Sequence, residues 1–539
     1  MSLLRSGTLV VVPWLVCQDA FVEDVVFLIA TQCLKMQRLS LISLASCSRQ
    51  LRLVCMPLVF STSSIKSIRF CSTPIPPPGI RPYIRRLIHV GTPDPVSFEE
   101  LLKHLPEIRA VVFNCAHARV PLAVVEQCYR HAGIASLSFA DTSDCQSAWA
   151  YTTTHYHPGK ESHPNSLKQL SYAANLSKPT RASYYQVDCP KADIVAELGP
   201  IILRMHLSAE SLSFTPDRAP LARMADLPWP CLRDLTLTGR YSDASQVSSV
   251  PQLVSAMRNP RSLSIQVGQL ADRPRPTVLE RECTEMRALE SLTLAYPDPD
   301  DAIFAIAGPS LRYLSIRDHP RHYLKNMPVN RRLAMPILSS SECLRVLSRM
   351  SMPRLEHLEL VYEGDDLEEE LLVHVASSYS HLHTFELHQY RHSPHGPAPL
   401  RYNRISEIVR SLDTLRTLRL NLDYAYQDAA IPQPRARADD DDDAYKSRWA
   451  SAEELVLYGS EILTILERRE GFHVLAELYL LYCDPNTCRR WVRFLPSRYS
   501  GTVAEPIDWG LDPESLYVVA SHWHGLVWML ADCDPCAYP

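Results

Sequence analysis

The string L-x-x-L-x-L recurs along this 539-residue chain and constrains its fold more than any other feature. The clear copies begin at Leu232, Leu289, Leu311, Leu355, Leu382, Leu415 and Leu475. Looser copies begin at Ile108, Ile134, Leu167, Ala209, Pro260 and Ala452. Leucines at the first, fourth and sixth places predict a short strand whose alternate side chains enter a core.

The spacing of the copies identifies the architecture. Successive fourth positions, Leu212, Leu235, Leu263, Leu292 and Leu314, are 23, 28, 29 and 22 residues apart. Leucine-rich repeats have lengths of about 20–29 residues and give each repeat one strand. We therefore expect an α/β leucine-rich-repeat solenoid, with a parallel sheet on its concave side and helices on its convex side.

Helical patterns separate the strand strings and complete the predicted repeats. They cover Ser97–Leu105, Leu122–Ala132, Glu368–Tyr379, Ile405–Leu412 and Thr487–Leu495. Ser97, followed by Glu100, has the spacing of a capping box.

Composition changes along the chain predict five regions. They are an N-terminal extension (1–20), a helical domain (21–70), a proline-rich linker (71–82), the irregular repeats (83–502) and an aromatic C-terminal cap (503–539). Within the repeats, 427–447 contains five consecutive aspartates and predicts a disordered acidic insertion, with docking of a basic partner as the alternative.

Composition and missing motifs argue against several functions. The net charge of −5 favours neither nucleic acid nor an anionic membrane as a partner. The chain has only 16 glycines and lacks GxxxxGK[ST], HExxH, GxSxG and GxGxxG, so we expect no enzyme and no cofactor. The 16 scattered cysteines are typical of reduced thiols, which predicts a cytoplasmic or nuclear protein.

Histidines and cysteines raise the question of a metal site. Five histidines gather at His381, His383, His388, His392 and His395. Cysteine pairs occur at Cys483 and Cys488 and at Cys533 and Cys536. A zinc site requires such ligands to converge tetrahedrally. Solvated histidines and structural cysteines are commoner, and we expect no metal.

Alternation along the strands predicts which side chains face a partner. The third, fifth and seventh places of each string point away from the core, onto the concave sheet. The side chains expected to bind a protein there are Tyr313, Arg317, His357, Glu359, Glu386, His388, Arg419, Asn421 and Tyr479.

The segment Phe21–Ile65 resembles the F-box of fungal F-box proteins. Ser48, Arg49, Leu51 and Arg52, then Pro57, Leu58 and Phe60, match the family pattern. Phe21 and Val22 stand where the family has Leu-Pro, so the motif is degenerate. An F-box followed by leucine-rich repeats is typical of that family.

The resemblance implies a substrate receptor of an SCF-type cullin–RING ubiquitin ligase. The F-box would bind a Skp-type adaptor and the repeats would bind an unknown protein substrate. The residues that the resemblance assigns to the adaptor are Phe21, Val22, Val25, Ile29, Leu41, Leu44, Leu51, Pro57 and Leu58. The alternative is a leucine-rich-repeat interaction scaffold with no link to ubiquitination.

Overall fold

The structure is a computed structural model, and it divides the chain into two compact units, Met1–Ser138 and Phe139–Pro539. It describes residues 30–31, 38–66, 75–115, 120–141, 167–174, 191–216, 219–240, 244–268, 275, 277–279, 286–319, 321, 336–390, 400–422, 452–468, 475–483, 489–496 and 506–511. Regions 1–20 and 427–447 lie outside these ranges.

The first unit begins with two helices, α2 (Arg38–Cys47) and α3 (Arg49–Phe60). They enclose a small core of Ala30, Leu41, Cys55 and Val59. The Ser48 hydroxyl caps α3 by accepting a hydrogen bond of 3.1 Å from the amide of Leu51.

A parallel sheet follows these helices. Strand β1 (Thr62–Lys66) pairs with β2 (Arg86–Val90), and β2 pairs with β3 (Ala110–Cys115). β1 therefore extends the sheet from inside the region predicted as a helical domain.

Two helices join the later strands of the first unit. They are α4 (Pro95–Lys103) and α5 (Leu122–Arg130), and β4 (Ser136–Asp141) follows α5. The predicted cap at Ser97 is wrong, because Asp94 caps α4 by accepting the Ser97 amide at 2.8 Å.

His89 of β2 lies in register with the buried Phe113 of β3, at a core position of the sheet. Its side chain is fully buried between Phe98 and Phe113, with ring centroids 5.9 and 6.0 Å away. Burial lowers the pKa of His89 below its ordinary 6.5, against an opposing hydrogen bond with the Gly91 carbonyl. The imidazole is therefore held neutral in the folded chain.

This burial predicts a pH-dependent loss of stability that His89→Leu reduces. The unfolded chain binds a proton near pH 6.5 and the folded chain only at lower pH. Stability is thus retained above pH 6.5 and falls as the pH drops below it. Thermal unfolding from pH 7.5 to 5.5 should show a smaller decrease for the variant; equal decreases would contradict the assignment.

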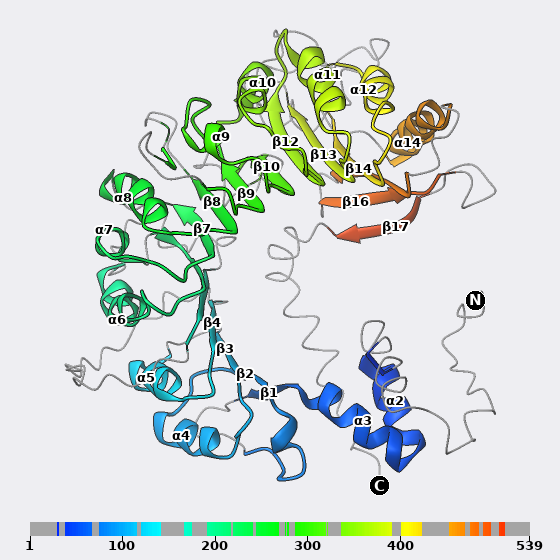
Figure 1. Cartoon of the computed structure of the whole chain (residues 1–539). Coiled ribbons are helices and arrows are strands. Elements are labelled where there is room, and N and C mark those ends of the chain that lie inside the picture. The colour runs from blue at the N-terminus through cyan, green and yellow to red at the C-terminus, as the bar shows by residue number, and fades with distance from the viewer. Residues whose placement is uncertain are drawn as a thin grey trace, which may run out of the picture. The chain divides into compact units, whose positions relative to one another are not determined.

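The second unit contains a parallel sheet whose strands follow chain order (Figure 1). Its strands are β5 (Gln169–Ala174), β6 (Ser211–Phe214), β7 (Asp234–Arg240), β8 (Ser262–Gly268), β9 (Ser291–Ala295), β10 (Tyr313–Arg317), β12 (His357–Glu363), β13 (Thr384–Tyr390), β14 (Thr417–Asn421) and β15 (Glu477–Cys483). A two-residue strand, β11 (Leu338–Ser339), pairs with the end of β12. The predicted α/β class with one parallel strand per string is confirmed for these repeats.

The described helices of the second unit lie on one face of this sheet (Figure 1). They are α6 (Lys191–Arg204), α7 (Leu221–Ala225), α8 (Ala244–Ser255), α9 (Ile303–Ile306), α10 (Ser340–Ser348), α11 (Glu368–Ser378), α12 (Tyr402–Val409) and α14 (Ala452–Glu467). The residues at the fourth and sixth places of each string point toward these helices. Leu235 and Leu237, for example, have no exposed surface. Helix α10 carries a capping box, formed by Ser339 and Glu342.

The string at Ala452 forms helix α14 and no strand, so the strand prediction there is wrong. Leu457, which would be a core residue in a strand, is 54% exposed. The buried residues are instead Leu455, Tyr458, Ile462, Leu463 and Leu466, with the three-and-four spacing of a helix face.

The parallel sheet ends in two antiparallel strands, β16 (Arg489–Phe494) and β17 (Pro506–Leu511). The helix predicted over Thr487–Leu495 is therefore wrong. Val492 and Phe494 are fully buried with Arg493 between them, which is the two-residue period of a strand. β17 is the only part of the predicted cap, 503–539, within the described ranges.

Cysteines of the described ranges include buried free thiols. Cys128 and Cys343 are fully buried, and burial raises the pKa of both thiols. Among the described helices, none has the length and apolar character needed to cross a bilayer.

Candidate functional site

The inner face of the second unit, opposite its helices, carries an aligned row of side chains at the fifth repeat position. Strand register places one residue of the row beside the next. In strand order from β6 the row is Ser213, Thr236, Ser264, Thr293, Ser315, Glu359, Glu386, Arg419 and Tyr479. The row changes from hydroxyl groups to charged and aromatic groups between β10 and β12.

The first part of the row forms a hydroxyl face over β6, β7 and β8. Ser213, Thr236 and Ser264 are half-buried, and the Gln266 side-chain amide donates a 2.9 Å hydrogen bond to the Ser264 hydroxyl. These side chains are short and partly exposed to solvent.

The second part forms a buried charge cluster, made of Arg317, Arg321, Glu359, Glu386 and His388. Glu359 Oε1 lies 2.5 Å from Arg321 Nη2, and its other oxygen accepts a 2.6 Å hydrogen bond from Ser315. Arg321 also lies 3.6 Å from Glu386 Oε1, which is 2.9 Å from His388 Nε2. Arg321 thus joins the segment that follows β10 to both β12 and β13.

Ionisation in the buried charge cluster is governed by the arginines. Burial acts to raise the pKa of Glu359, but Arg321 and Arg317 outweigh it and hold the pKa below its usual range. Burial likewise opposes ionisation of Glu386, and the hydrogen bond to His388 helps to lower the Glu386 pKa. Both carboxylates are therefore charged at neutral pH.

Aromatic rings border the cluster. Tyr313 and His357 stack with their ring centroids 4.3 Å apart and their planes at 15°. The Arg419 guanidinium lies over Tyr479, 5.2 Å from the ring centroid. An apolar cluster of Ile337, Val361, Tyr390, Leu481 and Trp491 adjoins them. Its Trp491 lies edge-on to His388, with the ring centroids 5.7 Å apart.

Metal binding is chemically conceivable at Glu359, Glu386 and His388, whose ligand atoms lie within 4.8 Å of one another. However, the Arg321 guanidinium already lies among these atoms, as the distances above show. A divalent cation here would have to displace Arg321 or meet its positive charge. The geometry therefore favours an ion-pair network over a metal centre.

The structure brings all nine predicted partner-binding residues onto one face, but it buries four of them. Glu359, Glu386, His388 and Asn421 are at most 6% exposed, so the expectation that they face a partner is wrong. Tyr313, Arg317, His357, Arg419 and Tyr479 are half-buried. Alternation identified the face correctly, but could not show that Arg321 and Trp491, from other segments, cover it.

The residues assigned to an adaptor are distributed differently. Phe21, Val22, Val25 and Ile29 lie outside the described ranges. Leu41 is fully buried within the helix pair, so its assignment to the adaptor surface is wrong. The other four are half-buried: Leu44, Leu51, Pro57 and Leu58.

Sequence reasoning missed two exposed apolar side chains on the helix pair. Ile42 of α2 is 43% exposed and Leu53 of α3 is 59% exposed. Ile42 directly follows the buried Leu41, and adjacent residues of a helix do not share a face.

Comparison with known proteins gives little further information. No family model matches the chain, and no curated protein matches its sequence. The matching solved chains number 31, and one is described as "Crystal structure of TLR13-ssRNA13 complex". That match has 13% identity and a TM-score of 0.26, and covers 68% of this chain but only 59% of the other.

Proposed function

We propose that this protein is a non-catalytic scaffold that binds another protein on its sheet. The hydroxyl face of β6, β7 and β8 carries the proposal, because Ser213, Thr236 and Ser264 lie side by side and half-buried. Hydroxyl groups held in register on neighbouring strands can pair with polar groups of a partner, and protein interfaces contain about one hydrogen bond per 100–200 Å². The buried charge cluster supports the same sheet structurally.

Bulky charged substitutions on the hydroxyl face should abolish partner binding. The double variant Thr236→Arg/Ser264→Arg places two long side chains on the face without entering the core. Proximity labelling with the full-length chain should lose a defined set of partners. Val373→Arg on α11, a site 47% exposed, is the matched control and should keep them. An unchanged set in the double variant would contradict the proposal.

A finer proposal is that the protein is the substrate receptor of an SCF-type ubiquitin ligase. It rests on the resemblance of Phe21–Ile65 to an F-box and is supported by Ile42 and Leu53, which offer apolar surface on α2 and α3. Other subunits would then perform the chemistry, and this chain would position the substrate.

Co-purification with a Skp-type adaptor at micromolar concentration tests the finer proposal. The wild-type chain should retain the adaptor, and Ile42→Asp/Leu53→Asp should lose it because charge replaces apolar contact. Absence of association with the wild type would leave the scaffold without a link to ubiquitination.

A further inference from the structure

A row of charged side chains crosses the start of the strands in the second unit, at the second repeat position. Four members of the row form two ion pairs between neighbouring strands: Lys168 with Glu210 at 2.7 Å, and Arg312 with Glu356 at 3.0 Å. Between these pairs stand Arg233 and Arg261 on adjacent strands. The Arg261 amide donates a 2.7 Å hydrogen bond to the Arg233 carbonyl, which fixes the two residues side by side.

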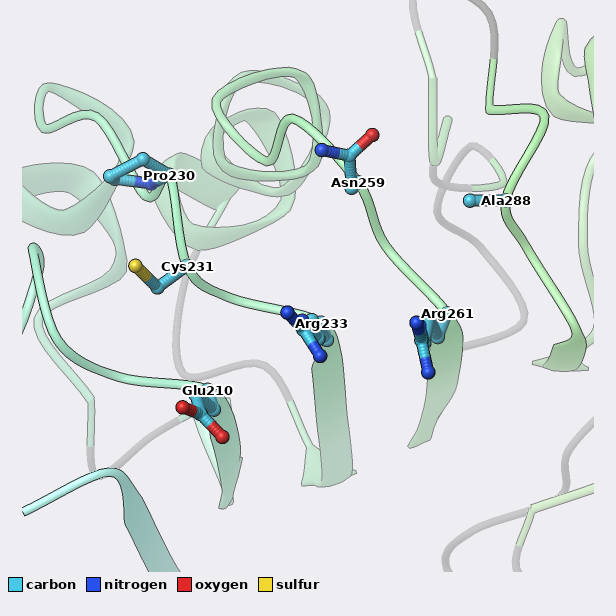
Figure 2. Close-up of a pocket in the computed structure, with 7 residues that line it drawn as sticks. All are labelled: Glu210, Pro230, Cys231, Arg233, Asn259, Arg261 and Ala288. Carbon is cyan, nitrogen blue, oxygen red and sulfur yellow. The ribbon is translucent and has the colours of Figure 1, made fainter.

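Arg233 and Arg261 line a shallow pocket of about 360 Å³, together with Glu210, Pro230, Cys231, Asn259 and Ala288 (Figure 2). Short residues in the sequence before each strand account for the pocket. Cys231, Asn259 and Ala288 lie close before their strands, where a later repeat has the long Arg354. Short side chains there leave open the space that Figure 2 shows beside the two arginines.

The charges around the pocket favour an anion. No carboxylate of the described ranges forms an ion pair with Arg233 or Arg261 within 4.0 Å. Glu210 is engaged by Lys168, whose hydrogen bond lowers the Glu210 pKa. Glu290, next in the row, also forms no ion pair with them. Asp234 feels the charges of Arg261 and Arg233, but burial outweighs them and raises its pKa, and it forms no ion pair with either arginine. Like charges on adjacent strands are unfavourable, and a bridging anion would relieve them.

We infer that this pocket binds an acidic side chain of a protein partner. The inference rests on the proposed scaffold function and adds the chemistry of one contact. Paired guanidinium groups hold a carboxylate through several charge-assisted hydrogen bonds, which a single lysine cannot match. The Asn259 side chain supplies a further polar group at the pocket wall. The contact lies beside the hydroxyl face, since Arg233 and Arg261 directly precede strands β7 and β8.

Direct binding of an acidic peptide to the purified full-length chain tests this inference. Fluorescein-labelled hexaglutamate should bind at low salt, and hexalysine should not. Arg233→Gln/Arg261→Gln should weaken hexaglutamate binding at least about tenfold. Arg416→Gln, an exposed arginine at the same repeat position outside the pocket, should change it less than about twofold. Equal binding by the double variant and the wild type would overturn the inference.

A footprint that needs no substitution provides a second readout. Cys231 in the pocket and Cys47 in α2 are both exposed free cysteines. Hexaglutamate should slow maleimide labelling of Cys231, measured by peptide mass spectrometry, and leave Cys47 unchanged. Unprotected Cys231 at a saturating peptide concentration would overturn the inference. Loss of partners by Thr236→Arg/Ser264→Arg would still support binding by the hydroxyl face, so failure of this inference is distinguishable from failure of the scaffold proposal.

Discussion

Arg321→Met is expected to destabilise the second unit by about 3–5 kcal/mol, which is the cost of leaving buried charges without their partner. Arg321 is 6% exposed and lies against Glu359 and Glu386, which are 2% and 6% exposed. Removing the guanidinium takes the nearest cation from the buried Glu359, while Glu386 keeps Arg419 at 3.2 Å and His388 at 2.9 Å. Amide hydrogen exchange in β12 and β13 should accelerate by on the order of a hundredfold or more.

Two further variants distinguish the effect of burying an ion pair from the effect of its charges alone. Arg345 also forms an ion pair, with Asp300, but its side chain is 56% exposed, so Arg345→Met should cost less than about 1 kcal/mol. Adding Glu359→Gln to Arg321→Met should restore part of the lost stability because one unpaired charge disappears. Equal losses for Arg321→Met and Arg345→Met would show that the cluster is solvated.

Acid should weaken the wild-type cluster in a defined range. The pKa values of Glu359 and Glu386 are both lowered from 4.5 in the folded chain. The unfolded chain therefore takes up protons first as the pH falls. This stability is complete above about pH 4.5 and is lost below it.

Trp229→Ala is expected to cost about 3–5 kcal/mol, through loss of packing and an unfilled cavity. Trp229 has no exposed surface, and its indole nitrogen donates a 2.8 Å hydrogen bond to the Met224 carbonyl. The backbone of Trp229 also forms an isolated parallel β-bridge with Met257, which follows helix α8. Urea unfolding should show the loss as a lower midpoint.

Controls for Trp229 distinguish volume from hydrogen bonding. Trp229→Phe keeps most of the ring volume and loses the indole donor, so its cost should be smaller than that of Trp229→Ala. Leu457→Ala on α14 removes a leucine that is 54% exposed and should change stability by less than about 0.5 kcal/mol. A Trp229→Ala cost as small as that of Leu457→Ala would contradict the burial.

The parallel strands were predictable because the leucine positions within each string show which side chains point into the core. Alternation alone predicts that Leu235 and Leu237 are buried, and the neighbouring repeats show the same pattern. The Ala452 string misled because Leu455 and Leu457 satisfy the strand pattern while the residues after them follow a helical period. Over six residues the sequence fits both the strand period and the helix period, and only a longer window distinguishes the two.

The functional face was only partly predictable for a different reason. The strand pattern places Glu359 and Glu386 on the inner face, which is correct. Their burial depends on Arg321, which lies in no strand string, and its contacts are set by tertiary packing. The pocket at Arg233 and Arg261 was missed because it depends on short neighbours such as Cys231 and Ala288, at a position with no repeat signature.

The bridging position of Arg321 has a consequence for how the sheet comes apart. Hydrogen bonds along the sheet join only neighbouring strands, so a repeat array can open from any weak point. Arg321 comes from the segment after β10 and holds β12 and β13 together through their side chains. We expect β10 to β13 to open as one cooperative block in native-state exchange, while β6 to β8 open separately and earlier. The part of the sheet proposed to bind a partner would then be the part that the partner itself makes rigid.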